Sequence, residues 1–362
     1  MAGGKKQNKT LKVKTGIEPP GSINPEAVNK IRKHRKQLFD AGEYVEGIVN
    51  GNRSLLSQAI TIIESALPEH QELARGIIKG SLPHAGKSVR IGITGVPGVG
   101  KSTFIESLGI RITASGKKLA VLAIDPSSER SGGSILGDKT RMEDLSADEN
   151  AFIRPSPAGG SLGGVARKTR ETIILCEAGG YDVIFIETVG VGQSETTVHS
   201  MVDFFLLLML AGAGDELQGI KRGIMEMADL IAITKADGTN KEKAERAGRE
   251  YKNALHLFPP SESGWTPRVL TCSSLEQTGI MDIWQSVEEY VSFTMENGYF
   301  GQKRSRQSKY WMYEFIHESL RSHFYAHPRI GKKLELLEKR LMEGSISSFH
   351  AAMEILKEYL PS

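Results

Sequence analysis

Residues 95–102 have the spacing of a loop that holds phosphate. They read Gly-Val-Pro-Gly-Val-Gly-Lys-Ser, the pattern G-x-x-x-x-G-K-S. Glycines let main-chain N–H groups turn inward and lie close to an anion. Lys101 adds a positive charge for the β- and γ-phosphates, and the Ser102 hydroxyl can ligate Mg²⁺. The sequence therefore predicts a P-loop. The residues expected to contact the nucleotide here are Gly95, Val96, Pro97, Gly98, Val99, Gly100, Lys101, Ser102 and Thr103.

An acidic residue follows a later apolar stretch, at Glu187 in Glu-Thr-Val-Gly. A carboxylate at the carboxyl end of a strand beside the P-loop can hold Mg²⁺ directly or through water, and a glycine three residues on frees an N–H for the γ-phosphate. The usual residue there is Asp. Glu is one methylene longer, so Glu187 is expected either to support the metal or to position the attacking water. Gln193 is the second candidate for positioning that water. With Lys101, these two form the expected catalytic set.

The segment Ile-Thr-Lys-Ala-Asp-Gly at 233–238 predicts a choice of base. A carboxylate at Asp237 can accept hydrogen bonds from N1–H and the exocyclic amino group of guanine, whereas adenine presents an acceptor at N1. The Lys235 stem can lie over the base, and Thr234 stands where this motif commonly has Asn. Residues 271–275 follow the next strand and are placed to offer N–H groups to guanine O6. The expected base-contact residues are Thr234, Lys235, Asp237, Ser273, Ser274 and Leu275.

Two glycine-rich segments are candidates for moving parts. Residues 124–142 place Asp125 at a strand end and Asp138 after a Gly/Ser-rich stretch, which suits a switch that orders around Mg²⁺ and γ-phosphate. Residues 211–221 leave an apolar strand and are either a second mobile element or an ordinary strand-to-helix turn.

The elements that position these motifs alternate between strand and helix. A strand over 89–94 and a helix over 102–110 flank the P-loop. Further strands are expected at 119–124, 182–186, 204–210, 230–234 and 268–272, and further helices at 166–178, 241–255 and 280–294. This rhythm predicts an α/β P-loop NTPase fold with a doubly wound, mostly parallel sheet.

Helical sequence flanks that core on both sides. Caps and periodicity predict helices at 24–31 and 54–66, and residues 308–358 are helical with no strand signal. The expected organisation is a disordered basic tail (1–23), an N-terminal helical region (24–86), a P-loop GTPase domain (87–298) and a C-terminal helical arm (299–362).

Composition argues against several other classes of protein. The 362 residues carry Lys+Arg 46 against Asp+Glu 43, a net charge of +3, which argues against a nucleic-acid partner. The longest apolar run, 204–211, is far short of the roughly 20 residues that span a bilayer, so no membrane partner is expected. Cys176 and Cys272 are far apart and the nine His residues lack ligand spacing. We expect a protein of the reducing cytoplasm, without a secretory signal or a Cys/His metal site.

Together these motifs resemble the MeaB/MMAA/ArgK family of G3E GTPases. The matching strings are GVPGVGKST (95–103), IDPSSERSGGSILGDKTRM (124–142), IRPSPAGGSLGGVA (153–166), ETVGVGQSE (187–195), AGAGDELQGIK (211–221) and ITKADG (233–238). The resemblance implies a homodimeric, Mg²⁺-dependent GTPase that binds GTP and GDP. Its implied role is to chaperone the adenosylcobalamin enzyme methylmalonyl-CoA mutase or a related acyl-CoA mutase, gating cofactor loading and protecting the enzyme.

The resemblance also assigns residues to parts of that machine. It implies that residues 299–362 form a dimerisation arm. Positions of the Mg²⁺ site and its switch match Ser102, Asp125, Asp138 and Glu187. Positions of a third switch that answers the partner match Asp215, Glu216, Gln218 and Lys221.

Two other functions are consistent with a P-loop. Some proteins of this kind are named LAO/AO transport kinases, so an ATP-dependent kinase of a periplasmic amino-acid transport component is one alternative. A metallochaperone GTPase is another, against which the lack of Cys/His spacing argues.

Overall fold

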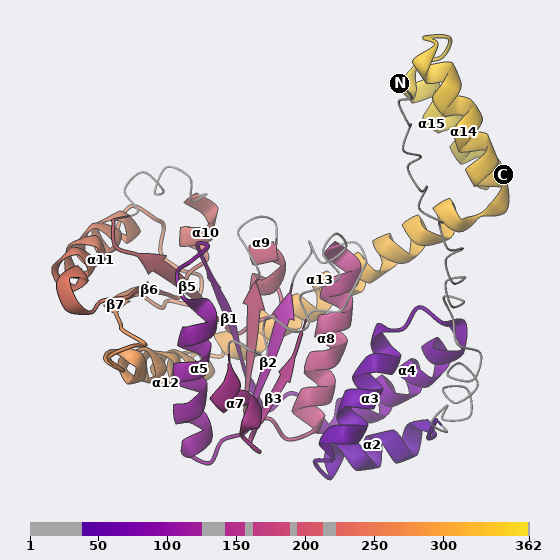
Figure 1. Cartoon of the computed structure of the whole chain (residues 1–362). Coiled ribbons are helices and arrows are strands. Elements are labelled where there is room, and N and C mark those ends of the chain that lie inside the picture. The colour runs from indigo at the N-terminus through magenta and orange to yellow at the C-terminus, as the bar shows by residue number, and fades with distance from the viewer. Residues whose placement is uncertain (1–37, 125–141, 156–161, 189–193, 213–221, 361–362) are drawn as a thin grey trace, which may run out of the picture. The chain divides into compact units, whose positions relative to one another are not determined.

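The fold is built on one parallel sheet (Figure 1). The computed structural model describes residues 38–124, 142–155, 162–188, 194–212 and 222–360. Contacts divide the chain into Met1–Asp40 and Ala41–Ser362, and the second unit holds the sheet. Its strand order is β3-β2-β4-β1-β5-β6-β7, and every pairing is parallel. The strands are β1 (Val89–Gly95), β2 (Leu119–Ile124), β3 (Ala151–Arg154), β4 (Val183–Thr188), β5 (Phe204–Leu210), β6 (Leu230–Thr234) and β7 (Arg268–Thr271).

Helices cover the two faces of the sheet in the way its strand order requires. The connections from β1 to β2 and from β2 to β3 run toward one edge, whereas those from β3 to β4, β4 to β5, β5 to β6 and β6 to β7 run toward the other. Right-handed crossovers therefore put the helices of the first two connections on one face and the helices of the connections from β3 onward on the other. In agreement, α5 packs with α7 and α12, and α8 packs with α9 and α13. These helices are α5 (Lys101–Ala114), α7 (Glu143–Ala147), α8 (Leu162–Ala178), α9 (Ser194–His199), α10 (Arg222–Glu226), α11 (Lys241–Leu255), α12 (Ile280–Glu296) and α13 (Tyr299–Ala326).

The predicted α/β fold class is confirmed, with two local corrections. Strand β3, at the edge of the sheet, is absent from the sequence prediction because it is only four residues long and ends in a charged arginine. Helix α8 begins at Leu162 and not at 166, since Gly163 and Gly164 disfavour a helix locally but lie within its first turn. The helix expected at 24–31 lies outside the described residues.

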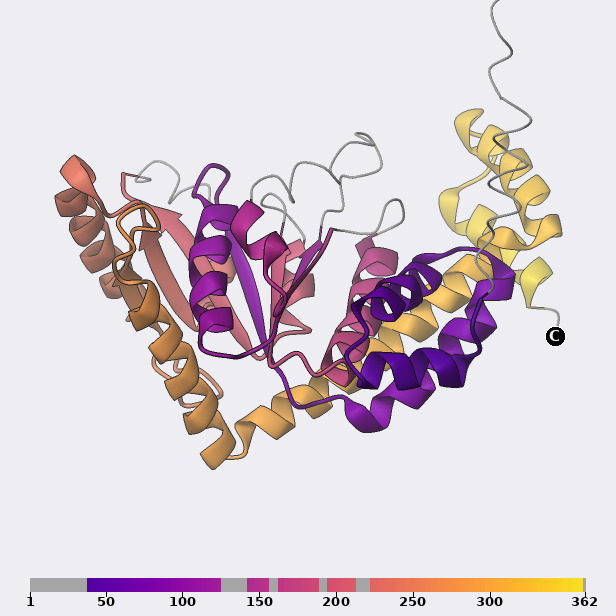
Figure 2. The same cartoon turned by 60° about the horizontal axis from the view of Figure 1, so that its bottom comes forward.

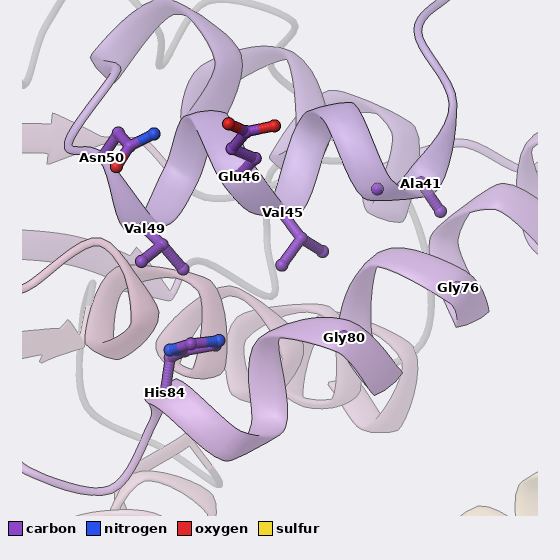
Figure 3. A pocket seen from close by; sticks show the side chains of 9 residues that line it. Ala41, Val45, Glu46, Val49, Asn50, Gly76, Gly80 and His84 are labelled. Carbon is purple, nitrogen blue, oxygen red and sulfur yellow. The ribbon is translucent and has the colours of Figure 1, made fainter.

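Three helices precede the sheet: α2 (Ala41–Val49), α3 (Arg53–Glu64) and α4 (Pro68–Ser81), followed by the 3₁₀ turn η1 (Leu82–His84). Helices α2 and α4 come close because α4 presents Gly76 and Gly80. A Cβ at Gly80 would lie 2.8 Å from Val45 Cγ2, and one at Gly76 2.9 Å from the Ala41 side chain. A cavity of about 390 Å³ lies beside this contact, and Figure 3 shows Val45 entering it from α2 and His84 from η1.

The C-terminal helices form a small hydrophobic cluster of their own. Helices α14 (Pro328–Met342) and α15 (Ser348–Tyr359) pack together after the 28-residue helix α13 (Figure 2). Their shared buried residues are Ile330, Leu337, Ala351 and Ile355. A second 3₁₀ turn, η2 (Gly238–Asn240), precedes α11. Within the described ranges, no helix is both long and apolar enough to cross a membrane.

Buried ion pairs attach α13 to the end of the sheet opposite the P-loop. Arg304 donates to both carboxylate oxygens of Asp203, at 2.8 and 2.7 Å, and to the Gly86 carbonyl at 2.7 Å. The Asp203 side chain is 1% exposed. Burial alone would lower the pKa of Arg304, but hydrogen bonds to Asp203 raise it above its usual value. Beside this pair, Arg90 donates to both carboxylate oxygens of Glu177.

The histidine that ends α9 predicts an acid-sensitive stability. The His199 ring lies edge-on to Phe205 at 5.5 Å, and burial, with Lys303 nearby, lowers its pKa to about 4. The unfolded chain takes up this proton near pH 6.5, so the group's contribution to stability is complete above pH 6.5 and is lost as pH falls toward 4. Between pH 7 and pH 5, the unfolding free energy of the parent should therefore fall by about 2 kcal/mol more than that of His199→Gln. Urea unfolding at the two pH values tests this, and equal losses in both proteins would contradict it.

Candidate functional site

The P-loop connects β1 to α5 at the centre of the sheet, where the strand order changes direction. Ligands of open α/β sheets bind at this kind of position. Position 95 requires glycine because β5 lies very close to it: a Cβ there would lie 2.4 Å from the Leu208 carbonyl oxygen. Gly100 caps α5 with φ +91°, in the left-handed region that favours glycine. The loop therefore leaves the strand and enters the helix as a phosphate-binding turn does.

Lys101 opens α5 and lies along the loop. Its Nζ donates to the Gly95 carbonyl at 2.8 Å. Burial lowers the pKa of Lys101, while the charges of Glu187 and Glu195 act in the opposite direction. Ser102 and Thr103 follow in the first turn, half-buried and exposed respectively. The start of α5 thus combines a cation, a hydroxyl and the positive end of a helix dipole, which together suit a polyphosphate.

Glu187 lies beside the P-loop. Strand β4 runs two residues further than predicted, to Thr188, and Glu187 pairs in register with Ile93 of β1. The Glu187 residue is 5% exposed, and the next hydroxyl, of Thr188, lies 2.8 Å from the Thr94 hydroxyl. A buried carboxylate close enough to influence the Lys101 pKa therefore stands at the edge where phosphates would bind.

Glu195 is a site residue that sequence reasoning named only as part of a motif. It lies in the first turn of α9, is fully buried, and affects the pKa of Lys101. Its place as the last residue of the 187–195 string is the signal that the sequence offers, but nothing local in the sequence indicates that α9 turns back toward the P-loop.

Thr234 and Lys235 connect the 233–238 segment, which the sequence predicts to contact the base, to the P-loop. The Thr234 hydroxyl donates to the Val99 carbonyl at 2.8 Å, and Lys235 Nζ donates to the Gly98 carbonyl at 2.8 Å. Lys235 has φ +56°, and its carbonyl accepts from the Asn240 amide. Threonine at 234 thus supplies a tether to the loop although it lacks the amide usual at this position.

The tether predicts a measurable effect of its removal. Thr234→Val keeps the shape but leaves the buried Val99 carbonyl without this donor, which should cost about 1–3 kcal/mol of unfolding free energy and weaken GDP binding. Thr234→Ser, which retains the hydroxyl, is the matched control. Denaturant unfolding and GDP titration of both variants check this; a valine variant indistinguishable from the serine variant would count against the tether.

Asp237 is held by the loop that follows β7. The Ser273 hydroxyl donates to Asp237 Oδ2 at 2.6 Å and itself accepts from the Glu276 N–H at 3.0 Å. The Ser273 N–H donates to the Thr278 carbonyl, and the Thr278 N–H donates back to Ser273. Ser274 and Leu275 lie in the turn between these bonds. The structure therefore uses the Ser273 side chain to orient the carboxylate, while its N–H closes the turn.

Seven of the residues singled out by sequence lie outside the described residues: Asp125, Asp138, Gln193, Asp215, Glu216, Gln218 and Lys221. The part of the chain that the structure does describe has no group of three His, Cys, Asp or Glu side chains suited to hold a metal.

The fold and the loop at the end of β1 define a P-loop nucleotide-binding protein. The family model described as methylmalonyl Co-A mutase-associated GTPase MeaB matches residues 56–329. The chain belongs to this MeaB family, of the G3E GTPases, and is itself a GTPase. Membership in a GTPase family implies that the nucleotide it binds is a guanine nucleotide.

Similar proteins span most of the chain. The GTPase ArgK of Escherichia coli K12 is 48% identical over 284 residues, covering 78% of this chain and 86% of its own. The mouse protein named methylmalonic aciduria type A homolog, mitochondrial, is 47% identical over 323 residues, covering 86% and 78%. A solved structure described as LAO/AO transport system kinase has a TM-score of 0.72 at 36% identity, covering 89% of this chain and 99% of that one.

Proposed function

We propose that this GTPase is a Mg²⁺-dependent chaperone of an adenosylcobalamin-dependent acyl-CoA mutase, with methylmalonyl-CoA mutase as its client. The observation that carries the proposal is the family match over 56–329, which contains both the P-loop and the base-recognition segment. The name of the mouse relative, which refers to methylmalonic aciduria, is consistent with it. In this role the GTPase gates cofactor loading and protects the mutase.

The hydrolysis step assigns the site residues as follows. Water attacks the γ-phosphate, the bond from the γ-phosphorus to the β–γ bridging oxygen breaks, and GDP and inorganic phosphate leave. The P-loop N–H groups and Lys101 stabilise the charge that develops on the phosphate oxygens. Glu187 and Gln193 are the candidates for positioning the water. The third switch, formed by Asp215, Glu216, Gln218 and Lys221, answers the partner.

Magnesium fits the donors near this loop. Mg²⁺ prefers hard oxygen ligands and in phosphate sites needs only one or two from the protein, the rest coming from phosphates and water. The Ser102 hydroxyl and the Glu187 carboxylate are oxygen donors at the start of α5 and the end of β4, and Asp125 and Asp138 are the further candidates. When bound, the ion neutralises charge on the β- and γ-phosphate oxygens.

The base is selected at the far end of the site. Asp237, oriented by Ser273, accepts from guanine N1–H and the exocyclic amino group. The N–H groups of Ser274 and Leu275 face guanine O6, and the Lys235 stem lies over the ring. Adenine would put a lone pair against the carboxylate and an amino donor against those N–H groups, so it is rejected.

We further propose that the C-terminal helices join two copies. Helix α13 exposes several large apolar residues, namely Tyr313 (48%), Phe315 (48%), Ile316 (42%) and Leu320 (59%). Tyr313, Ile316 and Leu320 are spaced by three and four residues, so they share one face of α13, and an exposed apolar face is typical of protein interfaces. Sedimentation equilibrium should give twice the chain mass, and Leu320→Glu should shift it to that of one chain. A monomer at micromolar concentration would contradict the assignment.

The client assignment is tested by mixing the purified chain with purified methylmalonyl-CoA mutase. We expect co-elution on gel filtration, faster GTP hydrolysis in the mixture, and adenosylcobalamin loading that depends on GTP. An isobutyryl-CoA mutase in a parallel arm identifies a related client. If neither mutase co-elutes or changes the hydrolysis rate, the chaperone proposal is wrong although the GTPase assignment stands.

A further inference from the structure

One contact joins the 273–278 turn, which is proposed to face the base, to helix α5, which begins at the P-loop. Gln277, in the turn closed by Ser273 and Thr278, reaches α5. Its Oε1 accepts from the Ser107 hydroxyl at 2.9 Å and from Arg111 Nη2 at 3.0 Å. Its main-chain carbonyl accepts a further bond from Arg111 Nη2 at 3.2 Å. Ser107 and Arg111 are four residues apart, so they share one face of α5.

The Gln277 side chain also forms a hydrogen bond within its own turn. Gln277 has φ +57°, which non-glycine residues rarely occupy. Its Nε2 donates back to the Ser274 carbonyl at 2.5 Å. The side chain therefore fixes the turn from two sides: Oε1 attaches it to α5, and Nε2 sets the peptide that follows Ser274. That peptide carries the Leu275 N–H.

The same helix thus serves both ends of the nucleotide. Its first turn carries Lys101 and Ser102 for the phosphates, and its third carries Arg111 for the loop that faces the base. Because α5 is a continuous 14-residue helix, the distance between the phosphate cradle and the base loop is set by one rigid element together with the Gln277 contact.

We propose that Gln277, held by Ser107 and Arg111, is a positioning residue that sets the Leu275 N–H against guanine O6 and so contributes to guanine selectivity. The inference rests on the proposed base site. The side chain itself touches no nucleotide; it acts by fixing the turn that does.

Gln277→Gly is the sharpest variant, because glycine adopts φ +57° without strain and the side-chain contacts are removed without distorting the turn. Arg111→Ala removes the contact from the helix side. Gln285→Ala, at an exposed glutamine of α12 bonded to Glu289, is the matched control. Each protein is titrated with GDP, with 6-thio-GDP, which alters only the group at position 6, and with IDP, which lacks only the 2-amino group that Asp237 would bind.

For Gln277→Gly and Arg111→Ala we expect GDP affinity to fall about tenfold, as for the loss of one hydrogen bond. The preference for GDP over 6-thio-GDP should largely disappear, and the preference for GDP over IDP should be retained. Gln285→Ala should match the parent. Unchanged discrimination at position 6, or an equal loss for all three nucleotides, would overturn the positioning role. If Asp237→Ala leaves the GDP-over-IDP preference of the parent intact, the proposed base site itself has failed, which is a separate outcome.

Discussion

Replacing Lys101 with alanine is expected to lower the rate of GTP hydrolysis at least a hundredfold. Loss of one preorganised group that stabilises charge in a transition state typically costs a factor of about 10²–10³ in rate. Lys101 lies along the P-loop, with Nζ 2.8 Å from the Gly95 carbonyl. Since a lysine here acts on the β- and γ-phosphates, GTP binding should weaken more than GDP binding.

Single-turnover hydrolysis and equilibrium titration with GDP and a non-hydrolysable GTP analogue measure these effects. Lys243→Ala, at an exposed lysine of α11, controls for the change of net charge and should behave as the parent. If the rate of GTP hydrolysis by Lys101→Ala is within threefold of the parent's rate, the P-loop lysine does not contribute to hydrolysis as proposed.

Arg304→Ala should destabilise the fold by about 3–5 kcal/mol, the cost of leaving one partner of a buried ion pair uncompensated. Removal of the guanidinium would strip both carboxylate oxygens of Asp203 of their Arg304 bonds, although the Arg90 N–H still donates to one of them. The Arg304 side chain is 16% exposed and that of Asp203 is 1% exposed, so solvent can replace little of what is lost.

The comparison for this variant lies two residues away on the same helix. Arg306 pairs with Glu262, but the two side chains are 56% and 72% exposed. Exposed pairs contribute roughly 0–1 kcal/mol, so Arg306→Ala should be nearly silent. Denaturant unfolding of the two variants side by side checks the contrast; equal, small losses would mean that the Arg304–Asp203 pair does not hold α13 to the sheet.

Most of the sheet could be predicted because its strands are buried on both faces. Continuous apolar runs such as 204–210 leave little choice of structure, and the observed β5 has the predicted bounds. Strand β3 could not be found in this way, because an edge strand of four residues has too short a pattern. The predicted start of α8 was too late because Gly163 and Gly164 have low helix propensity. In the folded protein, tertiary packing overrides that preference.

In the site, too, local sequence patterns could be predicted and long-range contacts could not. The P-loop and the 233–238 segment are local patterns, so their place at the ends of β1 and β6 follows from sequence. The contacts that organise them are not local: Gln277 meets Ser107 across 170 residues. Likewise, the Thr234 hydroxyl donates to the Val99 carbonyl. The sequence does not predict this bond, because the usual residue at position 234 is Asn.

The measurement that tests the account most directly is the nucleotide preference of the parent and of Asp237→Asn. The parent should bind GDP far more tightly than ADP or xanthosine diphosphate. Xanthine carries an acceptor where guanine has its amino group, and an amide can donate to it, so Asp237→Asn should lose GDP affinity and gain affinity for xanthosine diphosphate. A parent that binds ADP as tightly as GDP, or a variant with unchanged preference, would contradict the claim that this carboxylate selects the base.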